Sequence, residues 1–230
     1  MQNIHIHADS DALVAHIAAE LAAISHRPGV QHIALSGGST PKQLYRLLAS
    51  EAWRGRVNWA NLHLWWGDER CVPPQDPESN YGEAERLLLA YVPVPAAHIH
   101  RMRGEADPTA ERARYAADIA AHIPDGRYDW IILGIGDDGH TASLFPGATD
   151  YASGENVAIA HHPQSGQTRL TLTAPLIMRG KRLSYLATGS GKASILGQIA
   201  AGADYPAARI RATDGMTEYH LDRAAAAQQS

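Results

Sequence analysis

The chain alternates between apolar runs of strand length and segments in which apolar residues recur at helical spacing. Apolar runs without polar alternation are typical of strands that are covered on both faces of a sheet. Other short segments alternate in the manner of half-exposed strands. The predicted strands are 4–7, 30–35, 62–66, 128–133, 157–160, 169–173 and 182–188.

Helical segments lie between these strands. Asp9 and Ser10 offer capping groups for the first helix, and Ser79 can cap a later one. Thr40 is suited to the N-cap of the second helix, with Pro41 at the first helical position. An Ala-rich helix after Pro108 is expected to pack through a face of small residues, Ala110, Ala113, Ala117 and Ala120.

This alternation predicts a single α/β domain over 1–230, with one doubly wound, mostly parallel sheet flanked by helices in a Rossmann-type architecture. No internal repeat or long linker interrupts the pattern. The Ala/Gln-rich segment 223–230 is expected to be a frayed tail. Ligands of open α/β sheets bind at the carboxyl ends of the strands, so the loops that follow the strands are the candidate sites.

Composition narrows the class of protein. The 230 residues are 45% hydrophobic and 19% charged, which is typical of a globular protein. The net charge is −4 and there is no run of Lys or Arg, so neither nucleic acid nor a membrane surface is an expected partner. A single cysteine, Cys71, and an amino terminus without a basic and apolar leader pattern predict a cytoplasmic protein.

The loop 133–147 concentrates chemistry after a predicted strand. His140 can take and return a proton near neutral pH, and Asp138 is close enough in sequence to orient it. The glycines allow close approach of the backbone and leave amide groups to face an oxyanion. The alternative is a glycine-rich turn with a solvated histidine.

The same glycines, Gly134, Gly136 and Gly139, satisfy the G-x-G-x-x-G dinucleotide pattern. Asp137 and Asp138 would place negative charge where the pyrophosphate lies, so this interpretation is rejected. No cofactor is therefore expected.

Two further loops carry polar groups at predicted strand ends. Gly37, Gly38, Ser39 and Thr40 present backbone and hydroxyl donors as a cradle for phosphate or sugar hydroxyls, unless they are only a well-capped turn. In the next loop, Arg70 is a candidate ligand for phosphate or an oxyanion, and Asp68 for a sugar hydroxyl. The alternative for Asp68, Glu69 and Arg70 is a surface ion cluster, and Asn80 is expected to point into the site.

Arg169 and Lys192 are candidate phosphate ligands at the start of a strand and of a helix. Their alternatives are an ordinary edge arginine and a solvated lysine. The segment around Lys192 is not a Walker loop, because Leu186 stands where glycine is required and Ala193 where the magnesium-binding hydroxyl should be.

The pairs His5/His7 and His98/His100 each project to one side of a strand and could hold a metal. No carboxylate or third histidine accompanies either pair in the sequence, so half-exposed strand histidines are preferred and no metal is predicted. Cys71 has no base partner nearby and is not expected to be a nucleophile.

Taken together, several motifs resemble the glucosamine-6-phosphate deaminase/6-phosphogluconolactonase family. They are 35–41 (LSGGSTP), 67–70 (GDER) with Val72-Pro73, Ser79-Asn80, and 134–147 (GIGDDGHTASLFPG). The resemblance spans most of the chain and implies the deaminase/isomerase-like fold. Deaminases of this type carry a glutamate five residues after the loop histidine and an aromatic residue at the position of Arg70. Here Phe145 and Arg70 occupy those positions, which favours the lactonase branch.

The resemblance implies cofactor-independent hydrolysis of 6-phospho-D-glucono-1,5-lactone to 6-phospho-D-gluconate in the oxidative pentose phosphate pathway. His140 would be the general base on water, with Asp138 as its orienting partner, and Arg70 with backbone N–H groups near Gly37 and Gly38 would stabilise the oxyanion. The phosphate and hydroxyls would be held by Ser39, Thr40, Arg169 and Lys192.

A sugar-phosphate isomerase or deaminase and a non-catalytic sugar-phosphate sensor are the alternatives. The sensor is disfavoured because no helix-turn-helix segment or basic arm accompanies the domain. The expected partner is a small sugar-phosphate lactone, and monomer and homodimer both stay open.

Overall fold

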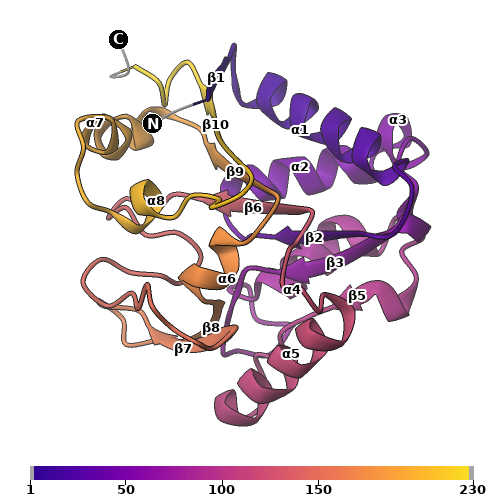
Figure 1. Ribbon diagram of the computed structural model, residues 1–230. Coiled ribbons are helices and arrows are strands. Elements are labelled where there is room, and N and C mark those ends of the chain that lie inside the picture. The colour runs from indigo at the N-terminus through magenta and orange to yellow at the C-terminus, as the bar shows by residue number, and fades with distance from the viewer. Residues whose placement is uncertain (1–2, 228–230) are drawn as a thin grey trace.

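The computed structural model describes residues 3–227, which form two β-sheets covered by helices (Figure 1). The larger sheet has seven parallel strands in the order β1-β10-β9-β6-β2-β3-β5. Its strands are β1 (Ile4–His7), β2 (Gln31–Leu35), β3 (Leu62–Trp66), β5 (Ile99–His100), β6 (Trp130–Gly134), β9 (Arg182–Ala187) and β10 (Met216–Asp222).

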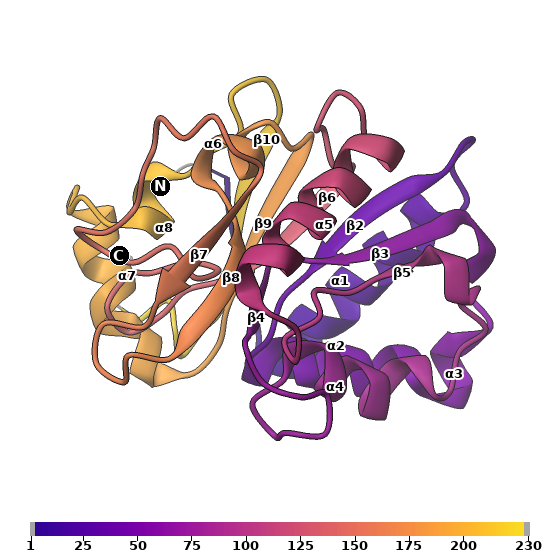
Figure 2. The same cartoon turned by 90° about the horizontal axis from the view of Figure 1, so that it is seen from below.

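Both faces of this sheet are buried, because successive side chains of a strand project to opposite faces. Trp66 and Ile132 enter one core, and Trp65 and Ile131 the other. Figure 2 shows α5 and the pair α1 and α2 on opposite sides of the sheet. The first core takes α1 (Ser10–Ser25), α2 (Ser39–Ala49) and α4 (Asn80–Ala84), and the second α5 (Pro108–His122), α6 (Ala174–Met178), α7 (Ala193–Ala200) and α8 (Pro206–Arg209). The predicted doubly wound α/β sheet is therefore confirmed.

The order of the strands reverses between β6 and β2. Successive strands run from β2 through β3 to β5 toward one edge, and from β6 through β9 to β10 toward the other. The loops that leave β2 and β6 at their carboxyl ends thus diverge to opposite sides. Such a topological switch point is where ligands of open α/β sheets bind.

A second sheet of three antiparallel strands adjoins the first. It consists of β4 (Asp68–Arg70), β8 (Thr168–Leu172) and β7 (Val157–His161) in the order β4-β8-β7. Strand β3 continues into β4 through Gly67, whose N–H donates to the carbonyl of Leu35 (2.9 Å) and whose carbonyl accepts from the Leu172 N–H (2.8 Å). The strands predicted at 157–160 and 169–173 exist, but they belong to this sheet and not to the parallel one.

Two helical predictions were wrong in detail. Helix α2 begins at Ser39 with Gly38 as its N-cap, so Thr40 is not the N-cap, and its hydroxyl lies 2.8 Å from that of Thr188. The small face of α5 is exposed at Ala110, Ala113, Ala117 and Ala120. The helix packs instead through larger side chains that fill the space above the sheet, Glu111, Tyr115 and Ile119.

Ser79 caps α4 as predicted, since its hydroxyl accepts the Gly82 N–H at 2.9 Å. This helix continues as a π-helical turn, Glu85–Leu89. The short helix α3 (Glu51–Arg54) follows α2. Of the predicted frayed tail, residues 223–227 form a turn in which Ala225 is fully buried, and 228–230 lie outside the described residues.

Within residues 3–227, no helix has the length and apolar character needed to cross a membrane.

Candidate active site

A cavity of about 320 Å³ lies at the carboxyl ends of β2, β6 and β9, bordered by β4 and β8 of the second sheet. All of the predicted site residues except Asp138 line it, and Asn80 points into it as expected. The lining residues are 36–41, Asp68, Arg70, Asn80, 134–137, His140, Ala142, Arg169, 186–188 and Lys192. Segments far apart in the sequence therefore meet at the topological switch point.

The loop after β6 is a tight turn that only glycines allow. The Gly136 N–H donates to the carbonyl of His140 (2.8 Å), and the Gly139 N–H donates to that of Gly136 (3.0 Å). A Cβ on Gly136 would lie 2.0 Å from Nδ1 of His140. Gly139 has a φ of +79°, in the region that favours glycine, and packs against Tyr205. The glycine spacing thus serves to present His140.

Asp138 orients His140 although it does not line the cavity. Its Oδ1 lies 2.5 Å from Nδ1 of the imidazole and accepts the His140 backbone N–H at 3.1 Å. Partial burial would raise the pKa of Asp138, but the hydrogen bonds from the ring and backbone of His140 outweigh burial and lower it. An ionised carboxylate on Nδ1 leaves Nε2 as the nitrogen that can exchange a proton with a ligand.

Two arginines approach the cavity from the second sheet without a carboxylate partner. Arg70 and Arg169 are paired in the register of β4 and β8. Arg70 donates from Nη1 to the carbonyl of Glu78 (2.6 Å), while its Nε is buried without a hydrogen-bond partner among residues 3–227. Arg169 donates from Nε to Oε1 of Gln167 (3.1 Å). Burial and the neighbouring charge of Arg70 lower the pKa of Arg169.

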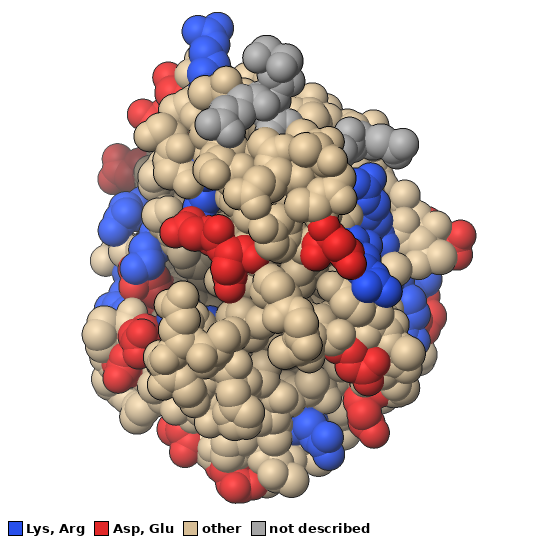
Figure 3. All heavy atoms as spheres, turned by 90° about the vertical axis from the view of Figure 1, so that its left-hand side faces the viewer, with Lys and Arg blue, Asp and Glu red and all other residues tan. Residues whose placement is uncertain are grey.

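The two arginines place positive charge without an ion-pair partner among residues 3–227 on one wall of the cavity. Figure 3 shows acidic and basic side chains interspersed on the face that lies to the left in Figure 1. No ion pair within 4.0 Å involves Arg70 or Arg169 in the described part of the chain. An anionic ligand would supply the missing counter-charge.

The alternation of β4 separates the charged triplet that follows β3. Asp68 and Arg70 face the cavity, whereas Glu69 points away from it. Glu69 accepts the backbone N–H groups of Arg70 (2.7 Å), Asn80 and Tyr81 (2.8 Å each) and the Ser79 hydroxyl (3.0 Å). Burial raises the pKa of Glu69 to about 7, against these backbone hydrogen bonds. Glu69 thus anchors the start of α4 and with it Asn80.

Asp68 is a buried carboxylate on the wall of the cavity. Its Oδ2 accepts the Ser143 hydroxyl at 2.7 Å, and its Oδ1 lies 3.3 Å from Nδ2 of Asn80. Asn80 in turn packs on the loop after β2, since a Cβ on Gly37 would lie 1.9 Å from Oδ1 of Asn80. The loop after β2 and the charged triplet therefore pack together through Asn80.

Lys192 precedes α7 at the side of the cavity formed by β9. Its Nζ lies 2.5 Å from Oδ1 of Asp137, a carboxylate whose side chain is 85% exposed. The order β9-β6-β2-β3 places Lys192 and the arginine pair on either side of the loops that carry His140 and Gly38. The cavity thus has cationic groups at both flanks.

Sequence reasoning missed Ser36, Thr188, Ile135 and Ala142 as lining residues. Thr188 follows a predicted strand and could have been found by the same rule as the other strand-end loops. Ser36 has a buried hydroxyl without a hydrogen-bond partner in the described structure. Cys71 is not among the lining residues, and burial followed by the charge of Glu69 raises the pKa of its thiol, as expected of a non-nucleophile.

Comparisons with known proteins agree with this geometry. The model of the family "Glucosamine-6-phosphate isomerases/6-phosphogluconolactonase" matches residues 7–219. A 6-phosphogluconolactonase of Haemophilus influenzae is 53% identical over 198 residues, covering 84% of this chain and 85% of that protein. One of Aggregatibacter actinomycetemcomitans is 51% identical over 214 residues, covering 91% and 92%.

Among solved structures, the crystal structure of devB protein superposes with a TM-score of 0.96 at 50% identity, covering 99% of both chains. The family match spans nearly all of the described chain, and it includes every residue that lines the cavity. The chain therefore belongs to the glucosamine-6-phosphate isomerase/6-phosphogluconolactonase family.

Proposed function

We propose that this protein hydrolyses 6-phospho-D-glucono-1,5-lactone to 6-phospho-D-gluconate. The relatives at 53% and 51% identity carry the name of that activity. The observation that carries the proposal is the pairing of an Asp138-oriented imidazole with two arginines, the buried Arg169 and the half-buried Arg70, that lack a carboxylate partner within residues 3–227. A phosphorylated lactone offers an anion for the arginines and an electrophilic carbonyl for water activated by the imidazole.

In the proposed reaction, Nε2 of His140 accepts a proton from water as the water oxygen bonds to the lactone carbonyl carbon. The carbonyl oxygen becomes an oxyanion, which Arg70 and backbone N–H groups near Gly37 and Gly38 stabilise. When the intermediate collapses, the bond from this carbon to the ring oxygen breaks, and Nε2–H returns its proton to that oxygen. The carboxylic acid formed then ionises to 6-phospho-D-gluconate, and its proton passes to solvent, while the imidazole returns to its starting form.

Substrate positioning is assigned to the remaining residues of the cavity. Ser39 and Thr40 lie in the first turn of α2, where backbone N–H groups and hydroxyls favour an anion. Arg169 and Lys192 add positive charge, and the buried carboxylate of Asp68 has lone pairs left to accept a sugar hydroxyl. None of these assignments requires a metal or a cofactor.

Phe145 favours hydrolysis over the isomerase or deaminase reaction that the family also contains. Its side chain is buried, and its ring centroid lies 5.0 Å from that of His140. A ring-opening relay of the deaminase type would need a second carboxylate in addition to Asp138, five residues after the histidine, and Phe145 supplies only an apolar face there. It therefore supports a simple hydrolytic role for the imidazole.

The test is lactone hydrolysis, with the substrate generated in place by glucose-6-phosphate dehydrogenase and acid release followed above the spontaneous rate. We expect His140→Asn to remove most of the excess rate, by about 100-fold or more, with substrate affinity little changed. His26→Asn, an exposed histidine on the other side of the fold, is the matched control. A folded wild type without excess rate, or proton exchange at C2 of a sugar phosphate in deuterated water, would move the assignment to the isomerase or deaminase branch.

A further inference from the structure

Five histidines gather around Asp118 on the α5 face of the large sheet, away from the cavity. We refer to His32, His63, His98, His100 and His122 as the histidine cluster. They come from β2, β3, the turn before β5, β5 itself and the last turn of α5. None of them lines the candidate active site. The proposed reaction leaves all of these side chains without a role.

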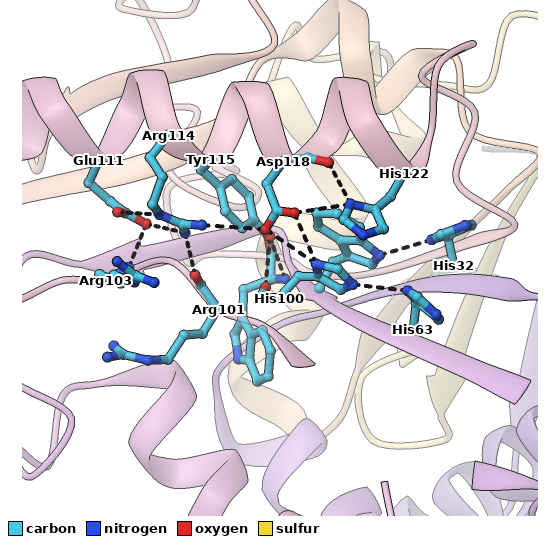
Figure 4. A network of polar contacts seen from close by, with 12 residues as sticks. His32, His63, His100, Arg101, Arg103, Glu111, Arg114, Tyr115, Asp118 and His122 are labelled. Atoms are coloured by element: carbon cyan, nitrogen blue, oxygen red, sulfur yellow. Dashed lines mark hydrogen bonds and ion pairs between the residues drawn. The ribbon is translucent and has the colours of Figure 1, made fainter. Parts of the chain in front are cut away.

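Asp118 lies between two imidazoles of the cluster, as Figure 4 shows. Nδ1 of His100 is 3.2 Å from Oδ2 of Asp118, and Nδ1 of His122 is 3.0 Å from Oδ1. Nδ1 of His122 also lies 3.0 Å from the Asp118 carbonyl, one helical turn back. One ligand atom from each of the three residues lies within 4.8 Å of the others.

These spacings match a metal-ligand set. In a tetrahedral site with bonds of about 2.0–2.1 Å, the ligand atoms are roughly 3.3 Å apart. Measured to the single oxygen Oδ1 of Asp118, Nδ1 of His100 and Nδ1 of His122 lie at 3.3 and 3.0 Å, so these separations need to change by only a few tenths of an ångström. Asp118 and His122 are four residues apart on α5, which places them on one helix face. A helix and a strand thus converge on one point.

His100 already has the outer contacts of a metal ligand. Its Nε2 lies 2.9 Å from Nδ1 of His63, so Nε2–H can donate there when Nδ1 binds an ion. Its ring also stacks on Trp65, with centroids 3.8 Å apart and planes within 3°. Partners of this kind fix the orientation and tautomer of ligating histidines.

Asp118 supplies the carboxylate of the proposed ligand set. Arg114 competes only weakly for Asp118, at 3.4 Å, because its guanidinium is held by Glu111 at 2.6 and 2.7 Å. A cavity of about 620 Å³ lined by all three ligand residues provides an entry path.

We propose that His100, Asp118 and His122 bind one divalent transition-metal ion, with Zn²⁺ as the best fit to two imidazoles and a carboxylate, and with water in the fourth position. The ion would brace α5 against the edge strand β5. The objection raised from the sequence, that no carboxylate or third histidine accompanies His98 and His100, does not hold in three dimensions. His98 itself stacks on His63 and is not a ligand.

A second group with ligand geometry, His5, Glu218 and His220, serves as the internal comparison. Its carboxylate is already engaged by Arg182 (2.7 Å) and Ser184 (2.5 Å), and His220 is fully buried. The charge of Glu218 is therefore already balanced by Arg182, and a bound cation would lie close to that guanidinium. This group provides control variants with the same residue types.

The experiment is calorimetric titration of chelator-treated full-length protein with ZnCl₂, and visible absorption with CoCl₂, whose four-coordinate complexes absorb strongly. We expect one ion per chain in the wild type and in His5→Ala. His122→Ala and Asp118→Asn should bind at least tenfold more weakly, and His63→Ala about tenfold more weakly through the lost outer contact. Thermal unfolding in EDTA checks that each variant is folded.

Loss of binding in His5→Ala, or full-strength binding in both His122→Ala and Asp118→Asn, would overturn the proposal. Absence of binding in the wild type would do the same and would leave these residues as a hydrogen-bonded network. Lactone hydrolysis in EDTA should be unchanged in every one of these variants. Failure of this proposal is therefore separable from failure of the proposed function.

Discussion

Arg70 and Arg169 stand directly opposite each other on neighbouring antiparallel strands, and within residues 3–227 neither has a carboxylate within ion-pair distance. Like charges in opposed positions of a sheet are destabilising. Such a pair at the wall of a cavity is favourable only when a bound anion offsets the repulsion between the two guanidinium groups. The pair therefore links stability of the free protein to affinity for its ligand.

Arg169→Gln is predicted to weaken binding of the product, 6-phosphogluconate, by roughly 30-fold, which corresponds to about 2 kcal/mol. The same substitution should raise the free energy of unfolding of the ligand-free protein by a few tenths of a kcal/mol, or leave it unchanged, because the repulsion with Arg70 is removed. Calorimetry and urea denaturation measure the two effects. Arg46→Gln, at an exposed position of α2, should change neither, and a large loss of stability in Arg169→Gln would contradict this account.

Gly136→Ala is predicted to lower the turnover rate about 100-fold, since a methyl group there would push the His140 ring away from Asp138. Gly134→Ala, two residues earlier, meets no atom within 4 Å of the added Cβ and should keep nearly full activity. Steady-state kinetics and thermal unfolding distinguish displacement of the imidazole from loss of the fold. Equal activity of the two variants would show that the position of His140 is not set by this glycine.

Lys192→Ala should raise the Michaelis constant about tenfold, or roughly 1.4 kcal/mol, while the turnover rate stays within about twofold. Lys192 lines the cavity and contacts Asp137 at its rim, so its charge can reach a bound anion without touching the reacting bond. Lys181→Ala is the control, because Lys181 forms a comparable ion pair with Asp129 outside the cavity. An unchanged Michaelis constant in Lys192→Ala would mean that Lys192 is a solvated side chain without a role in substrate binding.

Acidification should destabilise the protein between about pH 6.5 and pH 4. Burial lowers the pKa values of His7, His32 and His63 from 6.5 to about 4, so the unfolded chain binds more protons than the folded one in that range. Stability present above pH 6.5 is then lost as the pH falls. Urea denaturation in EDTA should show a shallower pH dependence for His63→Gln than for the wild type, and an unchanged slope for His26→Gln. An identical slope in His63→Gln would refute this origin of acid sensitivity.

Most of the large sheet could be predicted because its central strands are apolar on both faces. Strand β10 could not be predicted, because Glu218, His220 and Asp222 are polar residues that break the apolar pattern although they are buried in the structure. Their partners come from other strands and loops, as when Glu218 accepts a hydrogen bond from Nε of Arg182 (2.7 Å) and Asp222 accepts one from the Gly189 N–H (3.0 Å). Local sequence carries no signal for burial that depends on distant partners. The strand expected around His98 and His100 exists only as the two residues of β5, and His98 lies in the turn before it.

The parts of the candidate site that lie in loops directly after predicted strands could be predicted. His140, Gly38 and Lys192 each come after an apolar strand, and parallel strands bring such loops together. The opposition of Arg70 and Arg169 could not be foreseen, because β4 consists of three charged residues and has no apolar signature. Asp68 lines the cavity, but its contacts with Ser143 and Asn80 could not be predicted, because these residues are 75 and 12 positions away in the sequence.

At Gly67 the chain passes from the parallel sheet into the antiparallel sheet. Whether the number of residues at this junction is odd or even decides which side chains of β4 face the cavity. Side chains of a strand alternate between its two faces. Asp68 and Arg70 therefore face the cavity only as long as the number of residues between β3 and β4 is unchanged or changes by an even number. One residue inserted after Gly67 would turn Glu69 inward and both flanking groups outward, while leaving the composition of the apolar strands untouched. Two inserted residues would restore the facing and shift its position by one strand repeat. The position of Arg70 relative to His140 is therefore set by a whole number of residues, and insertions keep Arg70 facing the cavity only in steps of two.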